Sequence, residues 1–261
     1  MLRADWVKWL LIGLGLLVKI LTFMAKMTKI LTETAVRARL PRERGVIFKE
    51  YNDLRQDYIL RVVSRHFGAR GDDPAPLLGK RLLDAGCGES TVGEFLALSG
   101  ADITAVEANR ALLKRAEASA AAFGAPITFV AGKVENLLRE GGKFEVILAL
   151  DLLEDVAEAG KLLWVLRQLL AKDGILVFSC IKRTWRAWVY HVLLSALYGR
   201  TKWGSRQWRR FKNPDELAQL CAAAGLKLRE VRNLRFSLSK QRWKMSDRRR
   251  GTRYVAYALG V

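Results

Sequence analysis

The chain has 261 residues and 51% of them are hydrophobic, so it can bury a substantial core as one domain with extensions. Its formal net charge of +19 is uneven: residues 1–45 carry +6, residues 46–180 carry −3 and residues 181–261 carry +16. Two basic segments on either side of a near-neutral core indicate that the protein contacts an anionic surface, either a membrane or a nucleic acid. The three cysteines lack metal-ligand spacing and are odd in number, which argues against a disulfide framework and for a reducing compartment. The chain has only two histidines, so a histidine-centred catalytic triad or zinc site is not expected.

The N-terminal segment, residues 1–45, is predicted to form a basic, hydrophobic membrane helix. Residues 9–25 are almost wholly apolar, which is about the lower length limit for spanning a bilayer, but Lys19 interrupts them. Lys8, Lys19 and Lys26 would fall on one side of a continuous helix, and this stripe favours a helix that lies in the membrane interface. A spanning helix and a helix packed on a partner protein remain open alternatives.

The rest of the chain predicts a helical cap and linker over residues 46–76, followed by a catalytic domain over residues 77–261. Alternating strand and helix patterns predict an α/β fold, a Rossmann-like seven-stranded, mostly parallel sheet with helices on both faces. The expected strands are Arg81–Asp84, Asp102–Val106, Ile127–Ala131, Phe144–Leu150, Ile175–Cys180, Leu226–Leu234 and Thr252–Leu259. The expected helices are Tyr51–Phe67, Val92–Leu98, Arg110–Phe123, Val134–Glu140, Ala159–Ala171 and one that begins at Asn213 and ends at Gly225.

The most informative motif is the turn at the end of the first strand, where Asp84 precedes Gly86 and Gly88. Glycines let the backbone pass close to a ligand that a Cβ atom would block. Roughly 20 residues on, the second strand ends at Glu107, whose carboxylate can accept hydrogen bonds from ribose hydroxyls. The order of acid and glycines resembles motif I of the class I methyltransferases, which implies S-adenosylmethionine as the cofactor, and Asp84 is expected to order its loop.

Three carboxylates follow the fourth strand within five residues: Asp151, Glu154 and Asp155. Ligands of open α/β sheets collect at the carboxyl ends of the strands, so this cluster should face the cofactor and the transferred methyl group. Carboxylate oxygens suit Mg²⁺ or another divalent cation, which would activate a catechol. Acids at a helix start are also common because of the helix dipole, so the cluster alone does not establish a metal site.

Several segments in order resemble the ubiquinone-biosynthesis O-methyltransferases, over roughly Phe48 to Leu259. The family's Asn-Pro-Leu-Arg-x-x-Tyr-Ile segment matches residues 52–59, and its arginine implies that Arg55 contacts the cofactor carboxylate. The metal segment Glu-Met-Leu-Glu-His-Val matches residues 151–156, and further matches lie at residues 179–183, 204–211 and Arg253-Tyr254. The resemblance therefore implies that Asp151, Glu154 and Asp155 hold a metal ion at the catalytic centre and that Asp151 borders the cofactor.

The chain departs from the family pattern at four places. Ser90 replaces a third glycine, Asp151 and Asp155 replace Glu and His, and Arg206 and Gln207 replace His and Asp. The long apolar N-terminal helix is an addition. The all-oxygen carboxylate set puts the identity of the metal in question, and the loss of two polar groups at residues 206 and 207 puts the family's substrate in question.

An aromatic and basic insertion, residues 182–212, is predicted to form a lid. Its tryptophans and arginines suit membrane interfaces and nucleic acids alike, but its apolar middle, residues 189–197, favours a lipid-facing role. A helix that simply packs over the active site is the alternative reading.

Together these features predict a membrane-associated S-adenosylmethionine-dependent O-methyltransferase that acts on a lipophilic phenol or catechol, such as a polyprenyl quinone precursor. The catalytic domain is expected on the cytoplasmic, reducing face, with an anionic membrane surface and other quinone-pathway proteins as partners. Nucleic acid is disfavoured because no Asn/Asp-Pro-Pro-aromatic motif follows the fourth strand. A phospholipid N-methyltransferase, an RNA or DNA methyltransferase and a non-catalytic scaffold are the alternatives.

Overall fold

The computed structural model describes residues 41–69, 75, 77–89, 91–188, 208–237, 242–247 and 251–261. The chain divides into two compact units, Met1–Lys49 and Glu50–Val261, and the core and the site lie in the second. The predicted membrane helix up to residue 40 and residues 189–207 of the predicted lid fall outside the described residues. Among the helices of the described ranges, none is both long enough and apolar enough to cross a membrane.

The second unit is built on one sheet with the strand order β3-β2-β1-β4-β5-β8-β6-β7. The first five strands in that order are parallel to one another, and β8, β6 and β7 continue the sheet in antiparallel pairs. The strands are β1 (Arg81–Ala85), β2 (Asp102–Glu107), β3 (Ile127–Ala131), β4 (Phe144–Leu150), β5 (Leu170–Ile181), β6 (Leu226–Ser237), β7 (Arg242–Ser246) and β8 (Arg253–Gly260).

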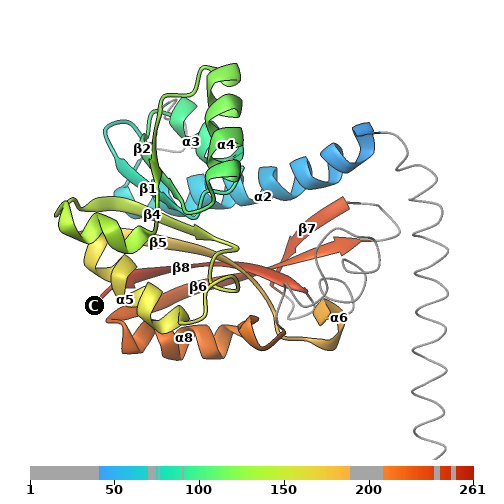
Figure 1. The fold of residues 1–261 in the computed structure, drawn as a ribbon. Helices are drawn as coiled ribbons and strands as arrows, with labels where there is room; N and C mark the ends of the chain where they lie inside the picture. Colours follow the sequence, from blue (N-terminus) through green and yellow to red (C-terminus); the bar gives the residue numbers. More distant parts are fainter. Residues whose placement is uncertain are drawn as a thin grey trace, which may run out of the picture. The chain divides into compact units, whose positions relative to one another are not determined.

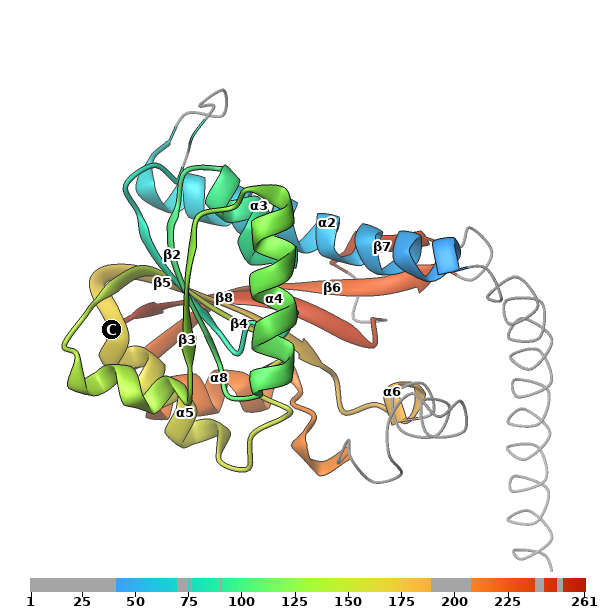
Figure 2. The same cartoon turned by 45° about the horizontal axis from the view of Figure 1, so that its top comes forward.

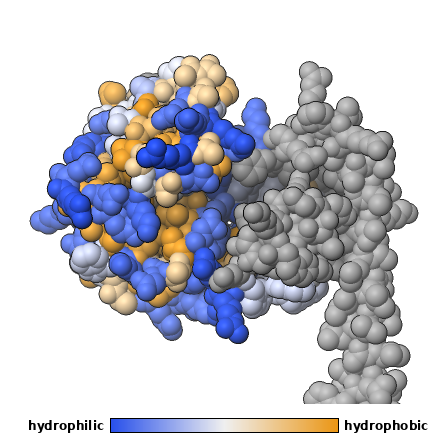
Figure 3. All heavy atoms as spheres, in the orientation of Figure 1, coloured by the Kyte–Doolittle hydropathy of each residue, from blue (hydrophilic) through white to orange (hydrophobic). Residues whose placement is uncertain are grey.

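Helices cover both faces of the sheet, as Figures 1 and 2 show, with α2, α3 and α4 on one face and α5 and α8 on the other. The bounds are α2 (Pro41–Phe67), α3 (Thr91–Leu98), α4 (Arg110–Phe123), α5 (Ala159–Leu169), α6 (Trp185–Trp188) and α8 (Pro214–Ala223), with 3₁₀ turns η1 (Val134–Arg139) and η3 (Trp208–Arg210). Hydrophobic residues are visible among hydrophilic ones in the middle of the face drawn in Figure 3.

Two hydrophobic cores lie on opposite faces of the sheet because successive strand side chains point to opposite sides. Leu82 of β1 packs in the core beneath α2, α3 and α4, whereas the next residue, Leu83, packs in the core beneath α5 and α8. Both side chains are fully buried. The parallel strands are thus covered on both sides, which is why they are nearly continuous in apolar residues.

Helix boundaries follow local signals in the sequence. The side chain of Asn109 caps α4 by accepting hydrogen bonds from the amides of Ala111 and Leu112, and Gly124 ends the helix in the left-handed conformation. Asn213 and Glu216 form a reciprocal capping box at the start of α8, with Pro214 in the first turn.

The predicted fold class and all seven predicted strands are confirmed, but the strand count was wrong because β7 adds an eighth strand. β6 runs three residues beyond its predicted end and pairs with Arg242–Ser246. This segment alternates polar residues with Trp243 and Met245, which pack against the core, but the alternation covers only five residues and was not recognised as a strand. The helix predicted at Val134–Glu140 is a 3₁₀ turn, and the helix predicted at Tyr51–Phe67 begins ten residues earlier, at Pro41.

The approach to β8 has no room for a side chain at Gly251. A Cβ atom there would lie 2.6 Å from the carbonyl oxygen of Leu234 and 2.9 Å from that of Arg253. We expect Gly251→Ala to lower the free energy of unfolding by about 1–3 kcal/mol in a urea titration, because backbone atoms must shift. Gly160→Ala is the matched control: its nearest neighbour would be 3.6 Å away, and alanine in α5 should be neutral or stabilise by up to about 1 kcal/mol. Equal unfolding midpoints for the two variants would contradict this account.

Candidate functional site

The predicted glycine turn lies at the carboxyl end of β1, beside the end of β2. The amides of Gly86 and Cys87 both donate to the carbonyl oxygen of Val106, at 2.8 and 3.1 Å, which holds the turn against the neighbouring strand. Gly86 and Gly88 adopt left-handed backbone angles, with φ of 69° and 60°. A Cβ atom on Gly86 would collide with Leu152, whereas one on Gly88 would meet no atom within 4 Å, so open space adjoins the turn there.

Glu107 connects this turn to the exit of β2. Its Oε2 accepts a hydrogen bond from the amide of Gly88 at 3.0 Å, and its Oε1 accepts one from the amide of Asn109 at 2.8 Å. A carboxylate has about four acceptor positions, so each oxygen keeps capacity for a further donor. The side chain is therefore oriented by the protein and is still able to accept hydrogen bonds from a vicinal diol.

Asp84 and Cys87 lie inside the same turn region. Asp84 is almost fully buried at the end of β1, and its role in ordering the loop stays a prediction. Burial raises the pKa of the Cys87 thiol, and the charges of Asp84 and Glu107 raise it further. A thiol held in its neutral form is a poor nucleophile, so Cys87 is a small residue that fits the turn.

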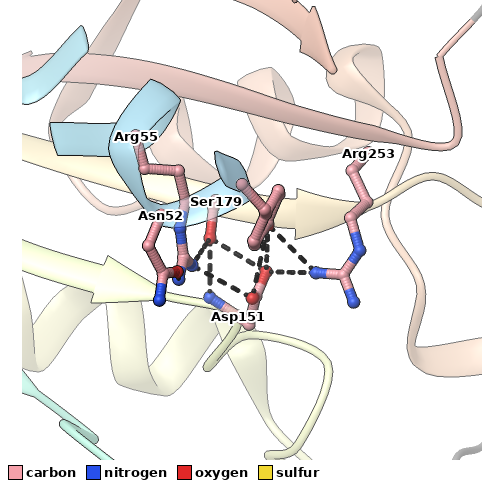
Figure 4. Close-up of polar contacts among 6 residues, drawn as sticks. Asn52, Arg55, Asp151, Ser179 and Arg253 are labelled. Atoms are coloured by element: carbon pink, nitrogen blue, oxygen red, sulfur yellow. Dashed lines mark hydrogen bonds and ion pairs between the residues drawn. The ribbon is translucent and has the colours of Figure 1, made fainter. Parts of the chain in front are cut away.

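The second part of the site is centred on Asp151, directly after β4 (Figure 4). Its Oδ2 accepts a hydrogen bond from Nη1 of Arg55 at 3.1 Å, and its Oδ1 forms an ion pair with Nη1 of Arg253 at 2.9 Å. Ser179 forms two hydrogen bonds with Asp151: its hydroxyl donates to Oδ1 at 2.9 Å and accepts from the amide of Asp151 at 3.0 Å. One carboxylate thus joins α2, β4, β5 and β8.

Tyr51 completes this cluster one helical turn before Arg55. The guanidinium carbons of Arg55 and Arg253 lie 4.3 and 5.1 Å from the centre of its ring, and Arg253 also donates to its hydroxyl at 3.0 Å. Burial raises the pKa of Tyr51; the nearby Arg253 opposes this effect and the charge of Asp151 adds to it. The phenol therefore stays protonated at neutral pH.

The backbone of Asp151 is unusual. Its φ of 55° is the only left-handed angle of a non-glycine residue in the described part of the chain. Such angles cost on the order of 1 kcal/mol and persist where surrounding contacts determine the conformation. The two arginines and Ser179 supply those contacts, so the strain is held at the end of β4.

The two other members of the acidic cluster lie in different surroundings. Glu154 is buried, with its Oε1 lacking a hydrogen-bond partner, whereas Asp155 is exposed. Burial, reinforced by the charge of Asp151, raises the pKa of Glu154 to about 8, although Arg253 acts in the opposite direction. Glu154 is therefore largely protonated at neutral pH.

The metal site predicted at Asp151, Glu154 and Asp155 is not assembled in this arrangement. Among the described residues, no group of three or more His, Cys, Asp or Glu side chains is placed to hold a metal ion. The oxygens of Asp151 point at guanidinium N–H groups, and Glu154 and Asp155 differ in exposure. These residues do not fit a divalent ion.

The glycine turn, by contrast, fits the predicted cofactor. Open space beside Gly88 and the oriented carboxylate of Glu107 suit the ribose and backbone contacts expected of S-adenosylmethionine. Arg55, predicted to contact the cofactor carboxylate, uses both terminal nitrogens on Asn52, Ser179 and Asp151, while its buried Nε has no partner. Its role with the cofactor stays a prediction.

Sequence reasoning placed Asp84, Gly86, Gly88 and Glu107 together correctly, since one loop and one strand exit join them. It missed Tyr51 and assigned no role to Ser179 or Arg253. The spacing of four residues between Tyr51 and Arg55 was a usable signal, because such residues share one face of a helix. The approach of Arg253 depends on the antiparallel pairing of β8 with β5, which local sequence does not reveal.

Comparisons with known proteins agree with this geometry. Residues 51–231 match the family model described as a methyltransferase domain. The chain is 31% identical over 211 residues to a ubiquinone biosynthesis O-methyltransferase of Dinoroseobacter shibae, covering 80% of this chain and 84% of that protein. It is 31% identical over 198 residues to the protein of the same name from Azorhizobium caulinodans, covering 75% and 78% of the two chains.

Solved structures share the fold. The magnesium protoporphyrin IX methyltransferase of Synechocystis, with bound S-adenosylhomocysteine, superposes with a TM-score of 0.54 at 19% identity, covering 79% of this chain and 84% of that one. An S-adenosylmethionine-dependent methyltransferase of Clostridium acetobutylicum gives a TM-score of 0.55 at 14% identity, covering 79% and 91%.

Removing the negative charge of Asp151 should destabilise the protein. Asp151→Asn leaves Arg55 and Arg253, both largely buried, facing each other without a counter-charge. Loss of one partner from a buried pair costs about 3–5 kcal/mol, and we expect roughly 2 kcal/mol here because Asp151 is 29% exposed. Urea unfolding measures it, with Glu89→Gln, from an exposed pair with Arg115, as a control worth at most about 1 kcal/mol.

The raised pKa of Glu154 predicts a pH dependence of stability. Between the unfolded value of about 4.3 and the folded value of about 8, the native protein binds more protons than the unfolded chain, so its free energy of unfolding falls as pH rises. Glu154→Gln has no titrating group at this position, so its free energy of unfolding should not fall in this way. The difference in free energy of unfolding between the variant and the wild type should therefore shift in favour of the variant by roughly 2–4 kcal/mol from pH 5 to pH 8. Urea unfolding across this range, with the exposed Glu158→Gln as control, measures the difference; parallel curves for Glu154→Gln and the wild type would show that Glu154 is ionised throughout.

Proposed function

Because the chain belongs to the ubiquinone-biosynthesis O-methyltransferase family, within the S-adenosylmethionine-dependent methyltransferases, we propose that it methylates a phenolic oxygen of a lipophilic quinone precursor. The observation that carries this proposal is Glu107, whose carboxylate is oriented by the amide of Gly88 beside open space at the end of β2. This pairing of an acid with a glycine turn suits a nucleoside-bearing cofactor.

The chain's residues have separate tasks in this reaction. Gly86 and Gly88 would let the cofactor approach the backbone, and Glu107 would accept hydrogen bonds from its ribose. When bound, S-adenosylmethionine would supply the methyl group from its sulfonium: the acceptor oxygen would form the new O–C bond as the S–C bond breaks, the sulfur would keep the electron pair, and the hydroxyl proton would pass to water. The cluster around Asp151, at the carboxyl end of β4, borders the space where donor and acceptor meet.

We propose further that the acceptor comes from an anionic membrane surface. Trp185 and Trp188 of α6 are 54% and 40% exposed, and the guanidinium of Arg186 lies 5.4 Å from the centre of the Trp185 ring. Exposed tryptophan with arginine suits the headgroup region of a bilayer. The net charge of +16 over residues 181–261 would attract anionic lipids, at about 1 kcal/mol for each basic residue near the surface.

The test is methyl transfer from labelled S-adenosylmethionine to a short-chain prenylated catechol in anionic liposomes. Glu107→Ala should weaken cofactor binding at least about 10-fold, because hydrogen bonds to a charged acceptor are worth about 1.5–3 kcal/mol. Glu89→Ala is the control, since Glu89 lies in the same loop region but its side chain is 58% exposed and pairs with Arg115. Equilibrium dialysis with labelled cofactor gives the affinities.

Three outcomes separate the alternatives. Transfer to the catechol that is lost together with cofactor affinity in Glu107→Ala supports the proposal. Cofactor binding without transfer to any phenol would contradict it and direct the search to phospholipids and RNA as acceptors. Wild-type protein that binds no S-adenosylmethionine would contradict it in favour of a non-catalytic scaffold.

A further inference from the structure

The acidic cluster after β4 already holds a cation. Nη1 of Arg253 lies 2.9 Å from Oδ1 of Asp151, so a guanidinium already occupies space beside the oxygen that a metal ion would need as a ligand (Figure 4). Arg55 takes the second oxygen at 3.1 Å. Both carboxylate oxygens of Asp151 therefore face N–H donors.

We infer that Arg253 is the resident cation of this site and that the protein transfers the methyl group without a divalent metal ion. The catalytic part of this inference rests on the proposed function. Arg253 acts as a positioning residue, which holds Asp151, Tyr51 and the end of β4 in place.

The charges of the buried part of the cluster offer little attraction for a divalent ion. Arg55 and Arg253 contribute two positive charges, and Asp151 and Glu154 contribute at most two negative ones. The further carboxylate, Asp155, is exposed to solvent. A divalent ion would thus enter beside two fixed cations in a partly buried site, where repulsion is stronger than in water.

The position of Arg253 is fixed by the fold. It begins β8, pairs with Ile181 of β5 and has a side chain only 12% exposed. Its Nη1 also donates to the hydroxyl of Tyr51 at 3.0 Å. Displacing the guanidinium would break these contacts and leave a cation without its counter-charge in a mostly buried place, so a metal ion cannot simply push it aside.

The donor set points the same way. Hard divalent ions need several oxygen ligands around one point. Glu154 is buried and its Oε1 has no partner, while the side chain of Asp155 is exposed and its carbonyl oxygen accepts a hydrogen bond from Arg210 at 3.1 Å. No third carboxylate of the described residues joins Asp151 and Glu154.

Binding of Mn²⁺, followed by the loss of its free electron paramagnetic resonance signal, tests this inference on the full chain. The wild type should show no saturable binding. Arg253→Asn, which removes the charge but keeps a polar side chain, should bind Mn²⁺ at least about 10-fold more tightly, and a second substitution, Asp151→Asn, should abolish that gain. Arg253→Lys is the matched control, because it keeps the charge and should exclude Mn²⁺ as the wild type does.

The inference is overturned if the wild type binds Mn²⁺ stoichiometrically and Asp151→Asn abolishes this binding. It is also overturned if folded Arg253→Asn, with its near-ultraviolet circular dichroism and cofactor binding retained, gains no affinity for Mn²⁺. The wild-type measurement decides the first point even where the variant does not fold.

A second readout uses catalysis. Transfer by the wild type should change by less than about two-fold on addition of EDTA, whereas activity that disappears with EDTA and returns with Mg²⁺ would overturn the inference. If no phenol is methylated under any condition, the proposed function fails, but the Mn²⁺ measurement still decides whether Arg253 excludes a metal ion.

Discussion

The ion pairs of Asp151 with Arg55 and Arg253 are the interaction on which the site depends. Three of the elements around it are far apart in the sequence: α2 carries Arg55, Asp151 directly follows β4, and β8 begins with Arg253. Because all three charges are largely removed from water, each needs the others to offset its desolvation. The same contacts hold Asp151 in its left-handed backbone conformation, so the backbone geometry after β4 depends on the ion pairs of the cluster.

The sheet topology explains why these groups meet. The five parallel strands bring the ends of β1, β2 and β4 to one edge, where the glycine turn, Glu107 and Asp151 lie. β8 runs antiparallel to β5, so its first residue, rather than its last, reaches this edge. An open α/β sheet collects ligands there, and the antiparallel strand adds a cation to a place where parallel strands contribute mostly loops.

The two halves of the site differ in the donors that surround their carboxylates. Around Glu107 the donors are backbone amides, which orient a carboxylate without neutralising it and leave capacity for a ligand. Around Asp151 the donors are guanidinium groups, which neutralise the carboxylate. Glu154, buried beside that cluster, is held mostly protonated instead of being paired. A ribose-bearing cofactor suits the first environment, whereas the second does not suit a divalent ion.

The amino-acid sequence by itself determined the fold class, the strands around the glycine turn and the pairing of Gly88 with Glu107, because these follow from local periodicity, backbone freedom and short spacing along the chain. The eighth strand, β7, was not predicted, because the alternation of polar and apolar residues in Arg242–Ser246 covers only five residues and its pairing with β6 is set by the tertiary structure. Nor could the sequence distinguish a metal site from a salt-bridged cluster at Asp151. The carboxylates are the same in both cases, and the difference lies in Arg253, which reaches them from 102 residues away only because β8 reverses its direction. Charge compensation acts through space, so only the tertiary structure decided which cation the acidic cluster holds.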